Sequence, residues 1–407
     1  MVANRVLVLD TNLRQGLVTL RNLGQHGIEI TAGSTTDLNP GAYSKYATRS
    51  LCYPSPLTDE VGFADAIEAE LRAREYDMVV GLGNATIPAL TKHRERFEQY
   101  TAIPYPPHDR LMIGFDKWDS YQAACDAGIP VPKSVLPDDI DFEAVESEIG
   151  YPVVLKPRQS HSRHGFVVCH SQAELETAYR NRNRELGSYL IQEYIPSDGE
   201  MGVYTLYDWS SNLVGLTVQR RLRTNPPEGG ISTLRETIDH PVAVQYADKL
   251  LRSIDWTCAA MVEYRIDSRD GVPKMLEINP RFWGSMALSV FAGVEFPYLL
   301  YQLVTTGTCE SQCSYNVGVQ AQHFPGEIGQ LLGRPDKLTA ARELFKRPSV
   351  PRTYDVLGRD DPAASIAYLA LNAQQLAAPV VERLVQSATF RGSRRMNPVA
   401  DVLSRIR

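Results

Sequence analysis

The sequence predicts an α/β protein in which an N-terminal domain with a parallel sheet precedes an α+β region and a mostly helical C-terminal tail. Strand and helix patterns alternate over the first hundred residues, and such alternation indicates a parallel sheet covered by helices. Two later strand patterns, joined by the short link Ser268–Val272, predict an antiparallel hairpin. The tail from Pro335 to Arg407 has the pattern of helices joined by loops.

The N-terminal domain is predicted from five periodic segments. They are, in chain order, Arg5–Asp10, Gln15–His26, Ile28–Ala32, Asp59–Arg74 and Met78–Leu82, of which the second and fourth are helices. The segment Gly81–Thr86 is close to the GxGxxG fingerprint of dinucleotide sites but lacks its third glycine. A plain strand-to-helix turn is therefore the better interpretation, and a Rossmann oxidoreductase is disfavoured.

Regular elements continue after a proline-rich break at Ile103–Pro107. The expected elements are helices over Asp119–Ala127 and Phe142–Glu148, strands over Pro152–Lys156 and Tyr189–Glu193, and a strand pattern from Tyr204 to Arg221. The apolar region Met286–Val304 is interrupted by Gly293, Glu295 and Pro297. It predicts a core helix and no membrane span.

Composition narrows the class of protein. The 407 residues are 43% hydrophobic and 22% charged, with a formal net charge of −6, as in ordinary globular proteins and unlike general nucleic-acid binders. The six cysteines are scattered and form no CxxC pairs, so free thiols in a reducing cytoplasm are expected in place of a zinc site.

Acidic and amide side chains gather on the predicted hairpin. Side chains alternate between the faces of a strand, so Glu277 and Asn279 point the same way, and Arg281 follows directly after Pro280. A two-residue turn would place Glu263 and Glu277 on opposite faces. A three-residue loop with left-handed Gly271 pairs them, about 5 Å apart at Cβ. Carboxylates that close need a cation between them, which predicts Mg²⁺ carrying phosphate.

Other polar residues fit a nucleotide. Lys156 ends an apolar strand, where a buried ammonium needs anionic partners such as phosphate oxygens. The basic loop Arg158–Gly165 is placed to fold over phosphates. Backbone groups of Glu193 and Ile195 are candidates to read an adenine edge, and the Glu200 carboxylate is a candidate acceptor for the ribose hydroxyls.

The order of these residues along the chain resembles that of the ATP-grasp superfamily, and more narrowly its carboxylate–amine ligases and predicted carboligases. The resemblance covers roughly residues 110–310. It implies phosphate-binding lysines at Lys117 and Lys156, an adenine hinge, and metal ligands at Glu263, Glu277 and Asn279, with Arg281 and Lys156 as catalytic residues. The implied hinge consists of Gln192, Glu193, Tyr194 and Ile195, followed by Glu200.

The resemblance also implies a division of the chain. An N-terminal α/β domain takes residues 1–112, the small and large ATP-grasp subdomains take 113–192 and 193–325, and a helical region takes 326–407. One departure from the family pattern is that the loop after Lys156 contains a single glycine, Gly165, where the family is commonly glycine-rich.

The implied activity is an ATP- and Mg²⁺-dependent ligase that activates a carboxylate as an acylphosphate and joins it to an amine. Mn²⁺ is an alternative metal. The partners are small molecules, with no nucleic acid or membrane. A kinase or carboxylase of the same superfamily, and a non-catalytic nucleotide-binding regulatory subunit, are the competing interpretations.

Substrate recognition is expected beyond the nucleotide site. The candidate residues are Arg220, Arg221, Arg223, Gly229, Gly230 and Trp283. Guanidiniums bind carboxylates through two hydrogen bonds, and glycines let the backbone approach a ligand. For the arginines and glycines, a basic hairpin with a flexible turn is as good an interpretation as substrate binding. For Trp283, core packing is as good an interpretation. The substrates, the role of the tail and the oligomeric state stay open, with a homodimer as one alternative.

Overall fold

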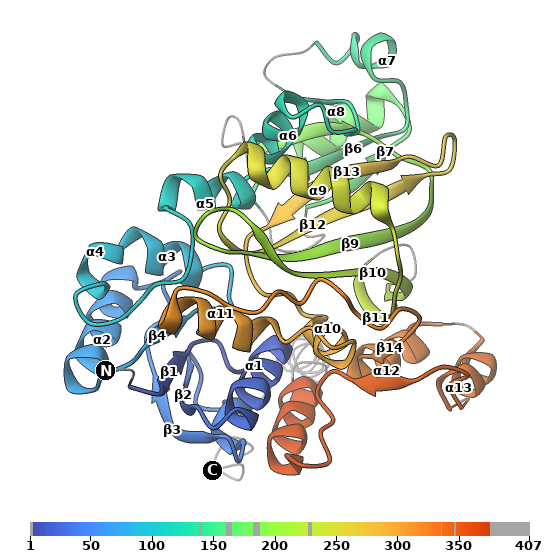
Figure 1. Cartoon of the computed structure of the whole chain (residues 1–407). Coiled ribbons are helices and arrows are strands. Elements are labelled where there is room, and N and C mark those ends of the chain that lie inside the picture. Colours follow the sequence, from blue (N-terminus) through green and yellow to red (C-terminus); the bar gives the residue numbers. More distant parts are fainter. Residues whose placement is uncertain are drawn as a thin grey trace, which may run out of the picture.

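Three β-sheets organise the chain (Figure 1). The computed structural model describes residues 3–137, 141–159, 165–181, 188–226, 230–334, 336–345 and 347–374. The N-terminal sheet lies at the lower left of Figure 1, the largest sheet crosses the centre, and the smallest sheet lies at the upper end.

The N-terminal sheet is parallel, as predicted, with the strand order β3-β2-β1-β4. The strands are β1 (Arg5–Val8), β2 (Glu29–Ser34), β3 (Ala47–Cys52) and β4 (Met78–Val80). The helices that cover them are α1 (Arg14–Gln25), α2 (Glu60–Ala73), α3 (Thr86–Lys92), α4 (Arg94–Phe97) and the short 3₁₀ helix η1 (Pro40–Tyr43). Strand β3 was not predicted, because it is a largely exposed edge strand without an alternating apolar pattern.

The turn Gly81–Thr86 is the plain strand-to-helix turn that the missing glycine indicated. The buried Asp10 carboxylate accepts hydrogen bonds from the N–H groups of Leu82 (3.0 Å) and Gly83 (2.7 Å) and from the Thr86 hydroxyl (2.9 Å). A Cβ atom at Gly83 would lie 2.9 Å from Asp10 Oδ2. The glycine is required by this internal hydrogen-bond network, so it gives no evidence for a bound dinucleotide.

The smallest sheet is antiparallel, with the order β5-β8-β6-β7. Its strands are β5 (Ser134–Val135), β6 (Val153–Pro157), β7 (Val167–Cys169) and β8 (Tyr189–Glu193). Helices α7 (Val145–Glu148) and α8 (Gln172–Arg180) pack against it, and α5 (His108–Phe115) and α6 (Lys117–Asp126) precede it in the chain. The expected helix and strand positions of this region are confirmed, with shifted ends.

The largest sheet has the order β13-β12-β9-β10-β11-β14-β15. Its strands are β9 (Ser197–Tyr207), β10 (Leu213–Asn225), β11 (Ile231–Thr237), β12 (Cys258–Asp267), β13 (Pro273–Asn279), β14 (Gln320–Gln322) and β15 (Arg352–Tyr354). The strand pattern predicted from Tyr204 to Arg221 is divided between β9 and β10, which the segment 208–212 connects. Helix α9 (Pro241–Ser253) packs on one face of this sheet.

The hairpin β12–β13 places Glu263 opposite Glu277, as predicted, but not through the predicted three-residue loop. Ile266 pairs with Pro273, and the Asp267 N–H donates to Val272 O (3.1 Å), so the connection is longer. Gly271 is left-handed, with φ of 72°. A β-bulge at Leu276 then shifts the pairing by one residue and produces the predicted register.

The apolar region after the hairpin forms two helices, α10 (Met286–Phe291) and α11 (Phe296–Thr306), and the prediction of one core helix was wrong. The chain reverses at Gly293, whose φ is 102°. Both helices contribute buried residues to the core, and no helix in the described ranges is long and apolar enough to span a membrane. All six cysteines are free.

The C-terminal region is helical with one added strand as far as the structure describes it, which is to residue 374. It contains α12 (Phe324–Gly333), α13 (Lys337–Phe345) and a helix that begins at residue 362. Strand β15 pairs with β14 in parallel and so extends the largest sheet beyond residue 325. The predicted domain limits remain predictions, but the sheet itself crosses the limit drawn between residues 325 and 326.

Arg21 and Asp361 connect helix α1 to the segment that follows β15. Arg21 Nε lies 2.9 Å from Asp361 Oδ2, and its Nη1 donates to Val356 O (2.9 Å). The Asp361 carboxylate also accepts from the Ser44 hydroxyl and the Lys45 N–H, and the residue is 1% exposed. A buried carboxylate with this many donors fixes the C-terminal segment against the N-terminal domain.

We predict that Asp361→Ala lowers the free energy of unfolding by about 3 kcal/mol, because Arg21 would keep a largely buried charge without its counter-ion. Urea denaturation of the purified variant measures this. Asp360→Ala is the matched control, since the Asp360 side chain is 46% exposed, and it should cost less than about 1 kcal/mol. Equal losses for the two variants would contradict the assignment.

Candidate nucleotide and metal site

One face of the largest sheet carries two parallel rows of polar side chains. Cross-strand pairing aligns the first row, which consists of Glu277, Glu263, Gly202, Gln219 and Thr237. The second row lies two residues further along each strand, and it consists of Arg265, Glu200, Arg221 and Arg235. Two residues of strand correspond to about 7 Å. The rows therefore form a polar floor across neighbouring strands.

Glu263 and Glu277 form the acidic end of the first row. Burial and the nearby carboxylates of Glu277 and Glu200 raise the pKa of Glu263 to about 7, although the Arg221 guanidinium opposes the shift. Burial also acts to raise the pKa of Glu277, but Lys117 and Lys156 outweigh it and hold that pKa below its usual value. The repulsion between the two carboxylates is thus only partly relieved by the protein.

Lys117 reaches the acidic row from the first turn of helix α6. Its Nζ lies 3.6 Å from Glu277 Oε2. The helix begins there because the Asp116 side chain accepts from the Trp118 N–H (2.9 Å), as an N-cap does. Asn279 Nδ2 donates to the other Glu277 oxygen, Oε1 (2.9 Å). The cap and the hairpin together orient the lysine, the carboxylate and the amide toward one point.

Lys156 is buried on strand β6, 8% exposed, as its place in an apolar strand indicated. Burial lowers the pKa of its ammonium to about 8, against the attraction of Glu277. Lys117 adds repulsion that lowers it further. An anion between the two lysines would reverse these effects, so their arrangement is suited to phosphate oxygens.

Arg281 is positioned by the N-terminal domain. Its Nε donates to Asn84 Oδ1, and its Nη2 donates to Asn279 Oδ1 (3.4 Å). Asn84 belongs to the turn that Asp10 organises, so the N-terminal sheet fixes the guanidinium beside the acidic row. The sequence indicated Arg281 but not Asn84, which stood in a segment interpreted only as a turn.

The predicted roles of Glu200 and Arg221 need adjustment. Arg221 Nη1 donates to Glu200 Oε2 (2.6 Å), and Arg221 Nη2 donates to Glu263 Oε2 (2.8 Å). Glu200 therefore lies beside the acidic row, where one of its oxygens is engaged by arginine, and its contact with a ribose stays a prediction. Arg221 is the counter-ion of two carboxylates within the protein. A substrate that binds Arg221 would have to compete with both of them.

The hinge lies between the smallest and largest sheets. The Glu193 N–H donates to Lys133 O (2.8 Å), and the Tyr194 N–H donates to Pro152 O (3.2 Å), so neither is available to a ligand. The Glu193 carboxylate pairs with Arg269 (2.6 Å). Among the backbone hydrogen bonds of the described residues, none uses the Ile195 N–H, which remains the candidate donor to adenine. The Gln192 side chain is buried and donates to Ser134 Oγ (2.9 Å), which gives it a structural role.

The loop after Lys156 is described only in part. Arg158 pairs with the buried Asp116, with Nη2 2.9 Å from Asp116 Oδ2, so this guanidinium helps to hold the cap of helix α6. Residues 160–164, to which the sequence assigned phosphate contacts, lie outside the described residues. Gly165 is left-handed, with φ of 83°.

Most of the predicted substrate-binding residues already contact other residues of the protein. Arg220 lies on the opposite face of the sheet, 54% exposed, where it pairs with Glu236 (2.7 Å), so its placement in the site was wrong. Arg223 binds the buried Glu327 through two nitrogens, at 3.2 and 2.8 Å. Trp283 packs in the core against Tyr204 and Phe296, as its alternative interpretation had it.

Gly230, in the β10–β11 connection, has a local explanation. A Cβ atom at Gly230 would lie 2.3 Å from Asn225 O, so the surrounding backbone excludes a side chain there. Gly230 is therefore explained without a ligand. Gly229 lies outside the described residues.

Two carboxylates of the first row, together with the neighbouring Asn279, form a donor set that fits a divalent cation. In the described part of the chain, no three His, Cys, Asp or Glu side chains are grouped for a metal. The candidate set is instead two carboxylates, from Glu263 and Glu277, and the Asn279 amide. Mg²⁺ is commonly held by one or two carboxylates, with phosphate and water oxygens completing its shell. The raised pKa of Glu263 marks unrelieved negative charge that a cation would neutralise.

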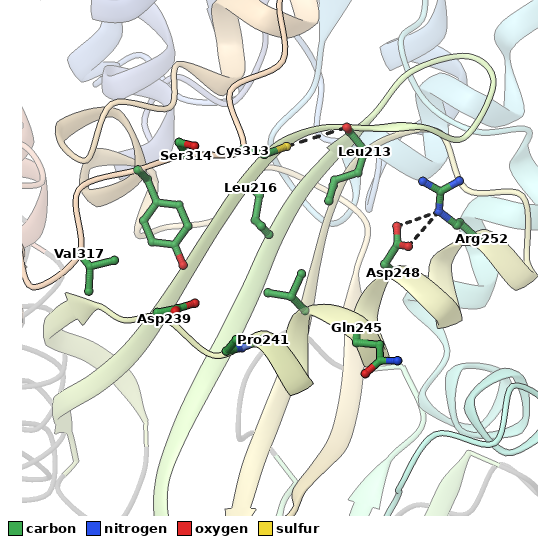
Figure 2. A pocket seen from close by; sticks show the side chains of 12 residues that line it. Leu213, Leu216, Asp239, Pro241, Gln245, Asp248, Arg252, Cys313, Ser314 and Val317 are labelled. Carbon is green, nitrogen blue, oxygen red and sulfur yellow. Dashed lines mark hydrogen bonds and ion pairs between the residues drawn. The ribbon is translucent and has the colours of Figure 1, made fainter.

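A cavity of about 600 Å³ lies on the face of the largest sheet that is opposite the two rows (Figure 2). Helix α9 and the segment around Tyr315 form its walls, and Leu216 is on its floor. Asp248 and Arg252 pair with each other at its edge, 2.9 Å apart. None of the predicted site residues lines it, and it brings no lysine to paired carboxylates. The paired carboxylates and the lysine that approaches them therefore lie on the face with the two rows and not at this cavity.

Three residues near the rows were missed by sequence analysis. Arg14, Arg235 and Asp355 come from the N-terminal domain, strand β11 and the segment after β15. They are isolated charges in the sequence, and no spacing rule links them. Arg235 faces the site by strand alternation from Thr237, which was the one available signal.

Comparisons with known proteins agree with this geometry. Residues 185–325 match a family model described as ATP-grasp in the biosynthetic pathway with Ter operon. The chain carries the ATP-grasp fold. The biotin carboxylase domain of Hydrogenobacter thermophilus 2-oxoglutarate carboxylase, solved with MgADP and bicarbonate, superposes with a TM-score of 0.65 at 17% identity, covering 79% of this chain and 74% of that one.

Two further ATP-grasp structures give similar superpositions. N5-carboxyaminoimidazole synthetase from Staphylococcus aureus, complexed with ADP, has a TM-score of 0.62 at 18% identity, covering 77% of this chain and 79% of that chain. L-amino acid ligase from Bacillus licheniformis has a TM-score of 0.58 at 17% identity, covering 74% of each chain. The resemblance of the sequence to the ATP-grasp superfamily is confirmed.

Curated relatives match over shorter stretches. D-alanine–D-alanine ligase of Laribacter hongkongensis (strain HLHK9) is 37% identical over 95 residues, which is 23% of this chain and 30% of the ligase. The same enzyme of Nitrosospira multiformis (strain ATCC 25196 / NCIMB 11849 / C 71) is 27% identical over 191 residues, 44% of this chain and 60% of the ligase. The matches thus span less than two thirds of these relatives.

We predict that Arg221→Met destabilises the protein by about 3 kcal/mol, because Glu200 and Glu263 would lose their shared counter-ion. Arg220→Met is the matched control on the exposed face and should change the free energy of unfolding by less than about 1 kcal/mol. Urea denaturation without added metal measures both variants. If Arg220→Met proved as damaging as Arg221→Met, the assignment of the two arginines to opposite faces would be contradicted.

Proposed function

We propose that this chain is an ATP-dependent ligase that joins a carboxylate to an amine through an acylphosphate, with amino-acid-like substrates. The observation that carries the proposal is the cross-strand pair Glu263–Glu277, flanked by Asn279 and Arg281 and facing Lys117 and Lys156. The ATP-grasp fold supports it, and the partial similarity to D-alanine–D-alanine ligases supports the choice of C–N bond formation.

In the proposed reaction a substrate carboxylate oxygen attacks the γ-phosphorus of ATP. The bond from that phosphorus to the β,γ-bridging oxygen breaks, and ADP leaves. The amine nitrogen of the second substrate then attacks the acyl carbon, the bond from that carbon to the phosphate oxygen breaks, and the nitrogen loses a proton as inorganic phosphate leaves.

The chain's own residues supply positioning and charge, which is most of what phosphoryl transfer requires. Lys117 and Lys156 would hold phosphate oxygens, and Arg281, fixed by Asn84, would stabilise the charge that develops on the acylphosphate. Glu263, Glu277 and Asn279 would hold Mg²⁺, which neutralises charge on the β- and γ-phosphates. No nucleophilic side chain is needed.

The competing functions differ in their products. A kinase would release a stable phosphorylated product without an amine, a carboxylase would require bicarbonate, and a regulatory subunit would bind ATP without turnover. Phosphate release measured with a carboxylate alone, with carboxylate plus amine, and with bicarbonate separates these cases. Mass spectrometry of the product identifies the bond formed. Use of Mn²⁺, a homodimeric state and a cytoplasmic location stay predictions.

We predict that Glu277→Gln keeps the fold and reduces MgATP turnover by at least about a hundredfold, because the neutral amide cannot balance the metal charge. Steady-state phosphate release and circular dichroism measure turnover and folding. Asp270→Asn, on the exposed tip of the same hairpin, is the control and should turn over like the wild type. Wild-type turnover in Glu277→Gln would remove this residue from the metal site.

We predict that MgADP binding weakens as the pH rises above 8. Lys156 has a pKa of about 8 in the free protein, so above that pH a proton must be taken up to bind the phosphates, and affinity falls by up to about tenfold per pH unit. Calorimetry between pH 7 and 9.5 measures the trend. In Lys156→Met, binding should be weaker at pH 7 and nearly independent of pH over this range. Affinity that rises with pH in the wild type would contradict the assignment.

A further inference from the structure

Two guanidiniums share one carboxylate beside the predicted nucleotide site. Arg235 Nη2 donates to Asp355 Oδ1, and Arg14 Nη1 lies 3.4 Å from Asp355 Oδ2. Both arginines also donate to Ser232 O, at 3.4 and 3.5 Å. The Arg235 side chain is 1% exposed and that of Asp355 is fully buried. These residues come from three parts of the chain, namely α1, β11 and the segment that follows β15.

The charges around this cluster do not balance. On the nucleotide side, the carboxylates of Glu200, Glu263 and Glu277 already face four cations, so they supply no spare counter-ion; these cations are Arg221, Lys117, Lys156 and Arg281. Around Asp355, two guanidiniums face one carboxylate. The other ionisable groups there do not compensate, since Glu327 is paired with Arg223, and burial with the nearby guanidiniums lowers the pKa of His323 to about 2, which leaves its ring neutral. One positive charge is therefore in excess.

Buried polar atoms near the cluster also lack partners. Arg235 Nε is buried and makes no hydrogen bond, and neither does Gln219 Oε1, although Gln219 Nε2 donates to Ser289 Oγ (2.9 Å). Gln219 lies in the first row between Gly202 and Thr237, while Arg235 lies in the second row. A buried donor and a buried acceptor in neighbouring rows would each be stabilised by a ligand. Burial also lowers the pKa of Arg235, so this guanidinium gains from an added anion.

The Arg14 guanidinium is held against the backbone that follows Arg281. A Cβ atom built on Gly284 would lie 2.3 Å from Arg14 Nε and 2.7 Å from its Cζ. Gly284 therefore has room for Arg14 only because it has no side chain. The charge from the N-terminal domain is in this way kept close to the predicted catalytic arginine.

We propose that Arg14 and Arg235 bind the carboxylate of the amine-bearing substrate, while Gln219 Oε1 accepts a hydrogen bond from its amine. This inference rests on the proposed ligase function and specifies the acceptor as an amino acid or a peptide. A carboxylate carries the single negative charge that the cluster lacks, and its two oxygens suit guanidinium nitrogens. The amine then lies toward the first row, two strands away from Glu263, and the carboxylate lies toward the second row.

The test uses binding, so it does not depend on turnover. MgADP binding to the full chain is measured first by calorimetry, and its absence would contradict the nucleotide site of the proposed function. The chain with MgADP is then titrated with glycine, D-alanine and the standard L-amino acids, each compared with its carboxamide, which lacks the negative charge. The same titrations are run on Arg14→Gln, Gly284→Ala and the control Gly333→Ala, where an added Cβ meets no atom within 4 Å.

The proposal expects at least one amino acid to bind while its carboxamide binds at least ten times more weakly. Arg14→Gln and Gly284→Ala should weaken that amino acid roughly ten- to a hundredfold, with MgADP affinity and thermal unfolding close to wild type. Gly333→Ala should bind like the wild type. The subsite is overturned if no amino acid binds to the wild-type chain, if carboxamides bind equally well, or if both cluster variants keep wild-type affinity.

Discussion

The cross-strand contact of Glu263 with Glu277 is the constraint on which the rest of the site depends. Two partly buried carboxylates at neighbouring strand positions repel each other, and the surrounding residues are arranged to limit that cost. Arg221 neutralises Glu263 from the second row on the same face of the sheet. Lys117 neutralises Glu277 from the start of α6. Each of these cations is in turn fixed, the first by Glu200 and the second by the Asp116 cap. The charges of the polar floor thus depend on one another. The protein's cations partly neutralise the carboxylates, and a bound metal and triphosphate are expected to add a further positive and negative charge at the same place.

The three sheets contribute differently to this arrangement. The largest sheet supplies the carboxylates, and because its rows extend over neighbouring strands, it can present oxygen ligands and guanidiniums at fixed spacing. The smallest sheet supplies Lys156. Its ammonium is buried because the lysine lies on an otherwise apolar strand. The N-terminal region supplies Asn84, from the turn after β4, and Arg14, from the start of α1. Asn84 contacts Arg281, and Arg14 shares Asp355 with Arg235. Residues from three parts of the chain therefore meet at the polar floor, which the largest sheet alone forms.

The sequence predicted most of the fold and the acidic half of the site, because periodicity and motif spacing report local geometry. The parallel N-terminal sheet, the hairpin and the shared face of Glu277 and Asn279 follow from strand alternation. The pairing of Glu263 with Glu277 was predicted from a three-residue loop, whereas the structure reaches it through a bulge. The cause of the register did not follow, since a bulge at Leu276 leaves no clear signature in composition. Arg220 was misplaced because two adjacent arginines on a strand must face opposite ways, and the sequence does not say which faces inward. Arg14 and Asp355 were beyond reach, because they meet only through tertiary packing of segments more than three hundred residues apart.

The place of β15 in the largest sheet has a consequence for synthesis of the protein on the ribosome. A nascent chain that has reached the end of the family-matched region, at residue 325, already contains every residue expected to contact the nucleotide. It still lacks Asp355, so the buried guanidinium of Arg235 has no counter-ion, and the strand β14 has an unpaired edge. The segment that contains β15 and Asp355 therefore closes both the sheet and the cationic cluster. The ATP-binding half can form before this segment leaves the ribosome, and the second half is completed only after residue 355 has emerged.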